Sequence, residues 1–192
     1  MKAAHIPSRE KCLTLMDKYE MFDHIKAHSL MVARVAEVIY ADLAAALPAA
    51  NLPPQNLVLA GAMLHDIAKS ICIKKGCCHS MVGAEICLAE GFAPLAEIVA
   101  EHVYITDYSS QNCCAGFFRA KELVYYADKR VRHDKVVSLE DRMEYIIERY
   151  GKNDKMIINI KKSFALCQDM EKAIFLFLPY KPEDLAARAG SK

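Results

Sequence analysis

The chain has 192 residues, enough for one domain with a substantial core. Hydrophobic residues make up 54% of it and charged residues 26%, a composition that excludes an intrinsically disordered protein. With 25 basic and 24 acidic residues the formal net charge is +1, so the charge balance indicates neither nucleic acid nor an anionic membrane surface as a partner. Any anion that the protein recognises must therefore be bound by a local patch.

The sequence gives no indication of a membrane or a secretory route. The first ten residues contain no apolar segment of the kind found in signal peptides. The longest apolar runs, residues 57–64 and 173–178, are too short to cross a bilayer. We therefore expect a soluble, cytoplasmic protein that does not associate with a membrane.

The eight cysteines are expected to be reduced thiols, because the chain is long and has no signal peptide. Most of them should serve as small apolar residues or as thiols in loops. A structural zinc site is a weaker alternative, since the spacing matches no standard zinc pattern. Its ligands would be Cys72, Cys77, Cys78, Cys113 and Cys114.

Apolar residues recur at helical spacing along most of the chain, and no segment shows the alternation that suits a strand. Asp23 is predicted to be the N-cap of the longest helix in the first half. Two stretches without periodicity, 70–78 and 104–118, indicate loops, and long loops often line a site. The predicted helices cover, in order, residues 8–19, 23–47, 54–68, 79–90, 94–102, 119–133, 138–151 and 154–177, followed by a tail at 179–192. The prediction is an all-α fold.

The most informative stretch is residues 62–69, where a wholly apolar run ends in His65 and Asp66, with Lys69 four positions after the histidine. The apolar run indicates the central helix of the domain. A carboxylate buried beside an imidazole is costly unless something compensates for it, and a metal ion is the commonest compensation. A surface turn with an ordinary histidine and aspartate is the alternative interpretation.

Further imidazoles and carboxylates fall on or beside the apolar faces of other predicted helices. Each of them alone could be a satisfied core histidine or a helix cap. Together they are typical of the metal sites that helical bundles build from inward-facing side chains on facing helices. The sequence therefore predicts one site formed by His28, His65, Asp66, His79, His102 and Asp128.

The pattern of His28, His65-Asp66 and Asp128 resembles the HD superfamily of metal-dependent phosphohydrolases. The flanking residues agree, with HSLMVA beginning at His28, LHDIAK around His65 and YADK around Asp128. The resemblance covers about residues 22–135. It implies a single HD-type domain over 1–192, an HD-domain helical bundle whose additional C-terminal helices occupy about 136–192.

His79 and His102 resemble the extra ligands of HD proteins that hold two metals, an arrangement shared by bacterial diadenosine tetraphosphate hydrolases. This resemblance implies two divalent transition-metal ions, drawn from Fe, Mn, Co, Ni or Zn, with Asp66 as the bridge. One ion would be completed by His28, His65 and Asp128, and the other by His79 and His102. No Gly-Tyr-Pro segment follows, which argues against the cyclic-dinucleotide phosphodiesterase branch.

The expected activity is hydrolysis of a phosphate ester or nucleotide through a metal-bound hydroxide, because two ions can activate water and clamp the attacking and leaving oxygens. The catalytic residues would be His65, Asp66 and Lys69. A small phosphorylated substrate would be bound by Lys69, Arg132 and His133, the last two being placed about one turn beyond Asp128.

Two alternatives use the same residues. A di-iron HD-fold oxygenase has the same ligand set, and imidazole and carboxylate do not discriminate between these metals. A non-catalytic metal-binding or nucleotide-binding HD module is the other, although a degenerate site would be expected to lose some ligands. Lys69 and Lys129 follow the hydrolase pattern and favour hydrolysis. A helical interaction protein without metal does not account for the six residues.

Overall fold

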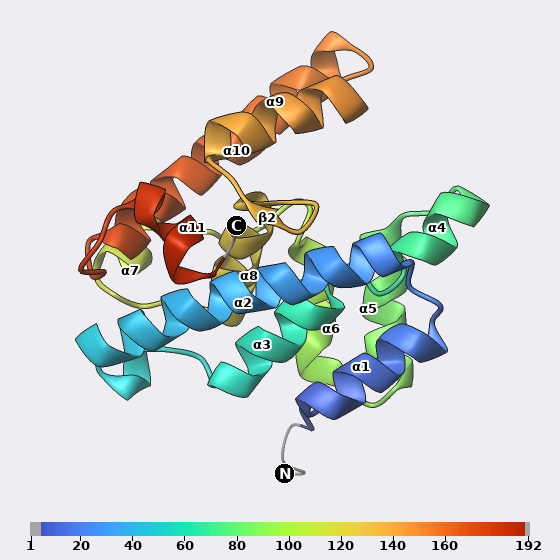
Figure 1. Ribbon diagram of the computed structural model, residues 1–192, viewed down its shortest axis with the longest axis horizontal. Helices are drawn as coiled ribbons and strands as arrows, with labels where there is room; N and C mark the ends of the chain where they lie inside the picture. The colour runs from blue at the N-terminus through green and yellow to red at the C-terminus, as the bar shows by residue number, and fades with distance from the viewer. Residues whose placement is uncertain (1–4, 191–192) are drawn as a thin grey trace.

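The computed structural model of the protein describes residues 5–190. Positions 1–4 and 191–192 lie outside the described residues. The ends of the predicted 1–192 domain and of the predicted 179–192 tail fall on these positions. The predicted all-α fold is confirmed (Figure 1). In chain order the elements are α1 (Arg9–Lys18), α2 (Asp23–Ala46), the 3₁₀ turn η1 (Ala49–Asn51), α3 (Gln55–Leu64), α4 (Lys69–Lys75), α5 (His79–Ala89), α6 (Ala93–Glu101), α7 (Ser110–Cys114), α8 (Ala120–Lys129), β1 (Val131–Arg132), β2 (Lys135–Val136), α9 (Leu139–Tyr150), α10 (Asp154–Phe175), η2 (Pro182–Asp184) and α11 (Leu185–Arg188).

The core is built around α3, which packs against α2, α6 and α8. Its last five residues, from Ala60 to Leu64, are all buried, as expected for a segment that is apolar on nearly every side. The long helix α2 crosses α3 and α8 and buries the stripe that includes Val32, Val35 and Ile39 (Figure 1). Each such fully buried aliphatic side chain contributes about 1.5–3 kcal/mol to stability.

Two glycines allow the helices around α6 to approach closely. A Cβ added at Gly83 of α5 would lie 2.7 Å from Cγ1 of Val99. A Cβ added at Gly61 of α3 would lie 2.9 Å from Cγ2 of Ile98. Real Cβ atoms do not make such contacts, so α6 is held between α3 and α5 at a spacing that only glycine permits at these positions.

The central helix ends earlier than predicted. The 54–68 prediction was wrong at its end, because α3 stops at Leu64 and two tight backbone bonds follow, from Ile67 N–H to the Leu64 carbonyl at 3.0 Å and from Lys69 N–H to the Asp66 carbonyl at 2.9 Å. The predicted 70–78 loop was also wrong, since α4 occupies most of it and is followed by the C-cap Gly76, where φ is +70°. The turn between α3 and α4 is what presents His65 and Asp66.

The helix predicted for 119–133 also ends early. α8 stops at Lys129, and residues 131–136 form an antiparallel hairpin in which Val131 faces Val136. The expectation that no strand would occur was therefore wrong, although each of these strands has only two residues, too few for alternation to be visible. The hairpin turn contains His133 with φ at +56°. Arg132 and His133 consequently lie on the hairpin rather than on a helical turn beyond Asp128.

Other boundaries were closer to expectation. The helix predicted for 138–151 is α9, and Ser138 caps it by accepting a hydrogen bond from the Asp141 N–H at 3.0 Å. Asp23 is the first residue of α2, and its predicted N-cap position is occupied by Phe22, which makes no side-chain cap. The stretch 104–118 contains the short helix α7 and so is not entirely a loop. α9 and α10 pack as a helical hairpin that projects from the body (Figure 1).

The prediction that all cysteines are reduced was wrong, because Cys72 and Cys77 form a disulfide across the end of α4. α4 brings their Cα atoms to 4.6 Å, a proximity that sequence spacing does not reveal. The pair is consequently unavailable for the alternative zinc site. The other cysteines are free, and Cys12, Cys87, Cys113 and Cys167 are buried as small apolar residues.

One stretch, Ala49–Lys75, has the length and mean hydropathy of a membrane-crossing helix, which the sequence analysis did not anticipate. Its most apolar window is 67% buried inside the fold. The stretch is also not one continuous helix, because α3 ends at Leu64 and α4 begins at Lys69. Because a core helix has the same composition, this stretch is explained by its place at the centre of the bundle.

Candidate metal centre

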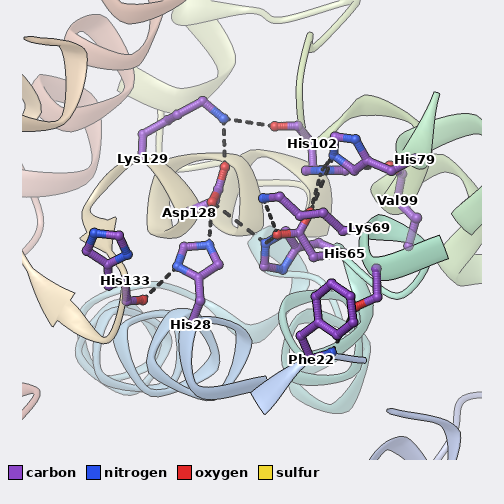
Figure 2. A network of polar contacts seen from close by, with 12 residues as sticks. Phe22, His28, His65, Lys69, His79, Val99, His102, Asp128, Lys129 and His133 are labelled. Carbon is purple, nitrogen blue, oxygen red and sulfur yellow. Dashed lines mark hydrogen bonds and ion pairs between the residues drawn. The ribbon is translucent and has the colours of Figure 1, made fainter. Parts of the chain in front are cut away.

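The predicted ligands, separated by up to a hundred positions in the sequence, face one another in one cluster (Figure 2). α2 and α8 each place a ligand on their buried face, His28 and Asp128. The turn after α3 presents His65 and Asp66. The remaining two stand at helix ends, His79 as the first residue of α5 and His102 directly after α6.

Three of the imidazoles are held by backbone carbonyl groups. Nδ1 of His28 donates to the carbonyl of His133 at 2.9 Å, Nδ1 of His65 to that of Ala62 at 2.7 Å, and Nδ1 of His102 to that of Val99 at 2.6 Å. A carbonyl oxygen can only accept, so in each neutral ring Nδ1 carries the hydrogen and Nε2 presents a lone pair. Metal-binding histidines are oriented in this manner by their outer partners.

The Nε2 atoms of these three rings, and that of His79, lie close to carboxylate oxygens. A lone pair facing a carboxylate is repulsive unless a proton or a cation lies between them. The Nε2 to oxygen distances are 3.0 Å from His28 to Asp128 Oδ1, 3.4 and 3.6 Å from His65 to Asp66 Oδ2 and Asp128 Oδ1, and 3.3 and 3.4 Å from His79 and His102 to Asp66 Oδ1. Two ligands bound about 2.1 Å from one ion at octahedral or tetrahedral angles are separated by ~3.0–3.4 Å, so the donor set has a spacing suited to a transition metal.

Two buried atoms of the cluster without hydrogen-bond partners show whether its residues suit a metal ion. His65 Nε2 and Asp66 Oδ1 are buried, and neither has a hydrogen-bond partner within residues 5–190. Each unsatisfied buried group of this kind costs about 1–3 kcal/mol. Both face the interior of the cluster, where one bound cation would satisfy several of these atoms at once. The residues therefore fit a metal ion chemically as well as by spacing.

The donors form two groups that share Asp66. His28, His65 and Asp66 offer ligand atoms within 4.8 Å of one another, and so do Asp66, His79 and His102. Asp128 adjoins the first group through His28 and His65. The geometry thus places Asp66 between two sets of donors, the position that the sequence analysis expected of a bridging carboxylate.

Two ammonium groups flank the carboxylates. Lys69 Nζ lies 2.7 Å from Asp66 Oδ2, and Lys129 Nζ lies 2.8 Å from Asp128 Oδ2 and 2.9 Å from the carbonyl of His102. Burial alone would raise the pKa of both carboxyls. The lysines and the nearby histidines outweigh burial and hold the pKa of Asp66 and of Asp128 well below the usual value. Both carboxylates are ionised at neutral pH, as ligands must be.

Burial has the opposite effect on two of the imidazoles. It lowers the pKa of His79 to about 4, and it also lowers the pKa of His102. The carboxylate of Asp66 opposes these shifts without reversing them. Both rings are therefore neutral at physiological pH, and the lone pair of a neutral imidazole is what a cation binds.

The substrate-binding role predicted for Arg132 and His133 remains a prediction. Both side chains are exposed on the hairpin and lie against the ring of Tyr145, with the Arg132 Cζ atom 4.5 Å from its centroid. His133 reaches the cluster through its backbone carbonyl, which accepts from His28. Lys69 is the predicted substrate-binding residue that directly contacts a ligand, Asp66.

Sequence analysis missed Arg142 of α9. This side chain is buried, and its Nη2 lies 3.8 Å from Asp128 Oδ1. A signal was present, because Arg142 follows the buried Leu139 by three positions and so falls on the inward face of the helix. An arginine on an apolar face needs a specific partner.

A cavity of about 450 Å³ lies next to the cluster rather than within it. Its wall includes Tyr104 and Ile105, at the start of the 104–118 stretch, and the expectation that this stretch lines the functional site stays a prediction. Tyr125 lines this cavity, and its ring centroid lies 4.3 Å from Nζ of Lys129, which contacts Asp128. The other lining residues are Asn159, Lys162, Ser163 and Leu166 of α10.

Comparison with known proteins relates the chain to a protein family and to a curated protein. The family described as "HD domain" matches residues 25–146, a range that contains every ligand of the cluster. The chain is also similar to the tRNA (cytidine(56)-2'-O)-methyltransferase of Thermoplasma volcanium, with 34% identity over 107 residues. That match covers 53% of this chain and 28% of the methyltransferase, so the chain spans less than a third of this relative's length. No solved structure matches the chain.

Proposed function

Because the chain belongs to the HD-domain family, we propose that it is a metal-dependent phosphohydrolase acting on a phosphate ester or nucleotide. The observation that supports this most strongly is the arrangement of the imidazoles. Three of them donate Nδ1–H to backbone carbonyls and direct Nε2 toward two ionised carboxylates. The unpartnered atoms, His65 Nε2 and Asp66 Oδ1, lie where a cation would bind.

We assign the residues to two ions that share Asp66. His28, His65 and Asp128 would complete one coordination sphere, and His79 and His102 the other. When bound, two divalent cations supply an activated water near neutral pH and neutralise charge on the phosphate oxygens. The assignment rests on the two donor groups and on their common carboxylate.

The two lysines have different roles in this proposal. The Lys69 side chain is 29% exposed, so its ammonium can donate to a phosphate oxygen while it holds Asp66. Lys129 is buried and fully engaged with Asp128 and the carbonyl of His102. We therefore treat Lys69 as a catalytic and substrate-binding residue and Lys129 as a positioning residue for the ligands.

The local charge favours an anionic substrate. Lys69, Lys129 and Arg142 offset Asp66 and Asp128 even before any cation binds. Divalent ions would make the centre strongly positive, which attracts phosphate and disfavours a neutral substrate. We accordingly propose a small phosphorylated molecule as the partner. The methyltransfer named for the Thermoplasma relative is not transferred to this chain, since the match covers 28% of that protein.

The test begins with protein purified without chelators. Elemental analysis is expected to find about two equivalents of transition metal per chain. A panel of phosphomonoesters and nucleotides, assayed with and without oxygen, should show phosphate release that needs no oxygen. Oxygen consumption without phosphate release would instead support the oxygenase.

Variants make the test specific. Asp66→Ala should lower phosphate release by about 10³-fold or more, because it removes several kcal/mol of charge stabilisation with the ions. Asp66→Asn keeps the shape of the side chain and should lose activity similarly if the charge is what matters. Asp17→Ala, at an exposed carboxylate paired with Lys26, is the matched control. An unchanged rate in both Asp66 variants would overturn the proposed function.

A further inference from the structure

The disulfide between Cys72 and Cys77 lies close in sequence to a candidate metal ligand. Cys77 is followed by Cys78, the N-cap of α5, and then by His79, the first residue of that helix. Cys72 lies in the middle of α4, at the edge of the molecule, and α4 packs against α5 (Figure 1). The bond therefore ties α4 to the backbone segment that places His79.

The bond acts on the local backbone more than on the whole fold. It joins residues only five positions apart and so closes a short loop, which contains the left-handed turn at Gly76. A disulfide stabilises a fold chiefly by restricting the unfolded chain, and this gain is smallest for short loops. What the bond fixes is consequently the end of α4 and the connection that leads from it into α5.

His79 is the imidazole of the centre whose position depends most on its backbone. The rings of His28, His65 and His102 are each held by a backbone carbonyl group at Nδ1. For His79 the described residues provide no such bond, and its side chain is 27% exposed. Its Nε2 nevertheless lies 3.3 Å from Asp66 Oδ1 and 3.1 Å from His102 Nε2. These distances are set by where α5 begins.

A thiol reductant can reach the bond, because Cys77 is exposed although Cys72 is buried. Exposed disulfides are opened more readily than buried ones, through attack of a thiolate on the accessible sulfur. A dithiol that attacks Cys77 Sγ forms a mixed disulfide and releases the sulfur of Cys72. The second thiol of the reductant then displaces Cys77. The reductant leaves as a disulfide, and two electrons and two protons have passed to the cysteines.

We infer that the Cys72–Cys77 bond is a redox-sensitive site that controls how tightly His79 and its neighbouring donors bind a cation. With the bond intact, the end of α4 and the start of α5 are held together. After reduction the connection between these helices is freer, so the imidazole without an anchor loses more conformational freedom when a cation binds. This inference rests on the metal centre of the proposed function and adds its regulation by a dithiol.

The test measures cation binding and backbone protection in the full-length protein, without any substrate. Chelator-treated protein is either oxidised in air or reduced with dithiothreitol that is then removed, and each form is titrated with Mn²⁺ in a calorimeter. Mn²⁺ is used because carboxylates suit it better than thiolates do. Hydrogen exchange follows the amides of Gly76 and Val82, which donate to the carbonyls of Cys72 and Cys78.

Labelling with iodoacetamide, followed by mass spectrometry of peptides, checks the state of the bond. Cys72 and Cys77 should be blocked in the oxidised protein and labelled after reduction. Labelling of both in the oxidised protein would overturn the inference.

Two variants separate this bond from the other cysteines. Cys72→Ser/Cys77→Ser cannot form the bond and should behave as reduced wild type, with or without dithiothreitol. Cys114→Ser is the matched control, since Cys114 is an exposed free cysteine of α7. It leaves the bond intact and should respond to the reductant as the wild type does.

We expect reduction to weaken Mn²⁺ binding at the weaker of two sites by about tenfold, the effect of losing an outer support of a ligand, and to leave the tighter site unchanged. Exchange of the two amides should become about tenfold faster. Equal Mn²⁺ binding by the oxidised and reduced proteins would overturn the inference. If reduction weakens Mn²⁺ binding while neither form releases phosphate from any ester, the redox-sensitive site stands and the proposed function fails.

Discussion

The two halves of the centre share Asp66 but differ in how firmly their other ligands are held. In the first half His28, His65 and Asp128 are 6%, 0% and 7% exposed, and both imidazoles are anchored through Nδ1. In the second half His102 is buried and anchored, whereas the His79 side chain is 27% exposed. No hydrogen bond to His79 Nδ1 occurs within the described residues. The first half is therefore preorganised, and the second is open at His79.

This difference predicts which group of donors binds a cation more tightly and which one solvent and substrate can reach. A ligand whose orientation is fixed before binding loses little conformational freedom when a cation arrives, so the first half should bind its ion more tightly. An exposed imidazole at the second half leaves room for solvent and substrate to enter. We therefore expect tight cation binding at the first half and entry of substrate at the second.

The largest expected effect comes from comparing His65→Gln with His79→Gln. His65→Gln should remove the tightly held ion and lower phosphate release by about 10³-fold, whereas His79→Gln should cost about 10–100-fold. Metal analysis of the purified variants should show a smaller loss of metal for His79→Gln. Equal losses of metal and activity in the two variants would show that the halves do not differ as the burial of their ligands suggests.

Stepwise removal of metal should affect the thermal stability of the protein differently at the two halves. A weak chelator is expected to strip the second half first, with little change in thermal unfolding, and a strong chelator then removes the other ion. The second step should cost about 3 kcal/mol, or roughly 6–12 °C in Tm, because a tightly bound ligand stabilises only the folded state. Release of all metal in one step, with one drop in Tm, would contradict the comparison.

The smallest effect on activity concerns two thiols, one beside each half. Cys78 precedes His79 and is exposed, and hydrogen bonds from Ser80 and the Met81 backbone lower its pKa. Cys167 is buried near Lys129 and Asp128, and burial raises its pKa. Iodoacetamide should therefore modify Cys78 about 10²-fold faster than Cys167, and modification of Cys78 should reduce phosphate release less than tenfold.

The rate at which Cys78 is modified should depend on pH in a direction set by its lowered pKa. A lowered pKa means that thiolate is already present at lower pH, so the Cys78 rate should level off below the value of about 8.5 typical of a free cysteine. Mass spectrometry of peptides after labelling between about pH 6 and about pH 9 measures both thiols in one sample. Comparable labelling of Cys167 would mean that the first half is not closed to solvent.

The ligands that could be predicted from sequence are those whose direction depends on local helical spacing. His28 and Asp128 lie on apolar stripes of long helices, and a period of 3.6 residues fixes which way such side chains point. His65 and Asp66 were found because a polar pair ends an apolar run. The structure brings all of them together as expected, and their binding of metal stays a prediction.

The features that sequence analysis did not find depend on contacts between distant residues or on very short elements. The end of α3 at Leu64 coincides with the hydrogen bond from His65 to the Ala62 carbonyl, which no periodicity encodes. The two-residue strands of the hairpin are too short for a pattern, and the Cys72–Cys77 pairing depends on how α4 folds. Arg142 was missed because its place beside the cluster depends on its approach to Asp128, which occurs only in the folded chain.

The close contact at Gly83 has a consequence for the spacing of two candidate metal ligands. His79 lies one turn before Gly83 on α5, and its Nε2 is 3.1 Å from that of His102, which directly follows α6. A single methyl group at Gly83 would push against Val99 and force the two helices apart, separating the imidazoles. The spacing of these two imidazoles therefore depends on Gly83, a residue that is not itself a candidate ligand. If the centre binds metal as proposed, replacing Gly83 with alanine should change which ion it prefers while every candidate ligand stays unchanged.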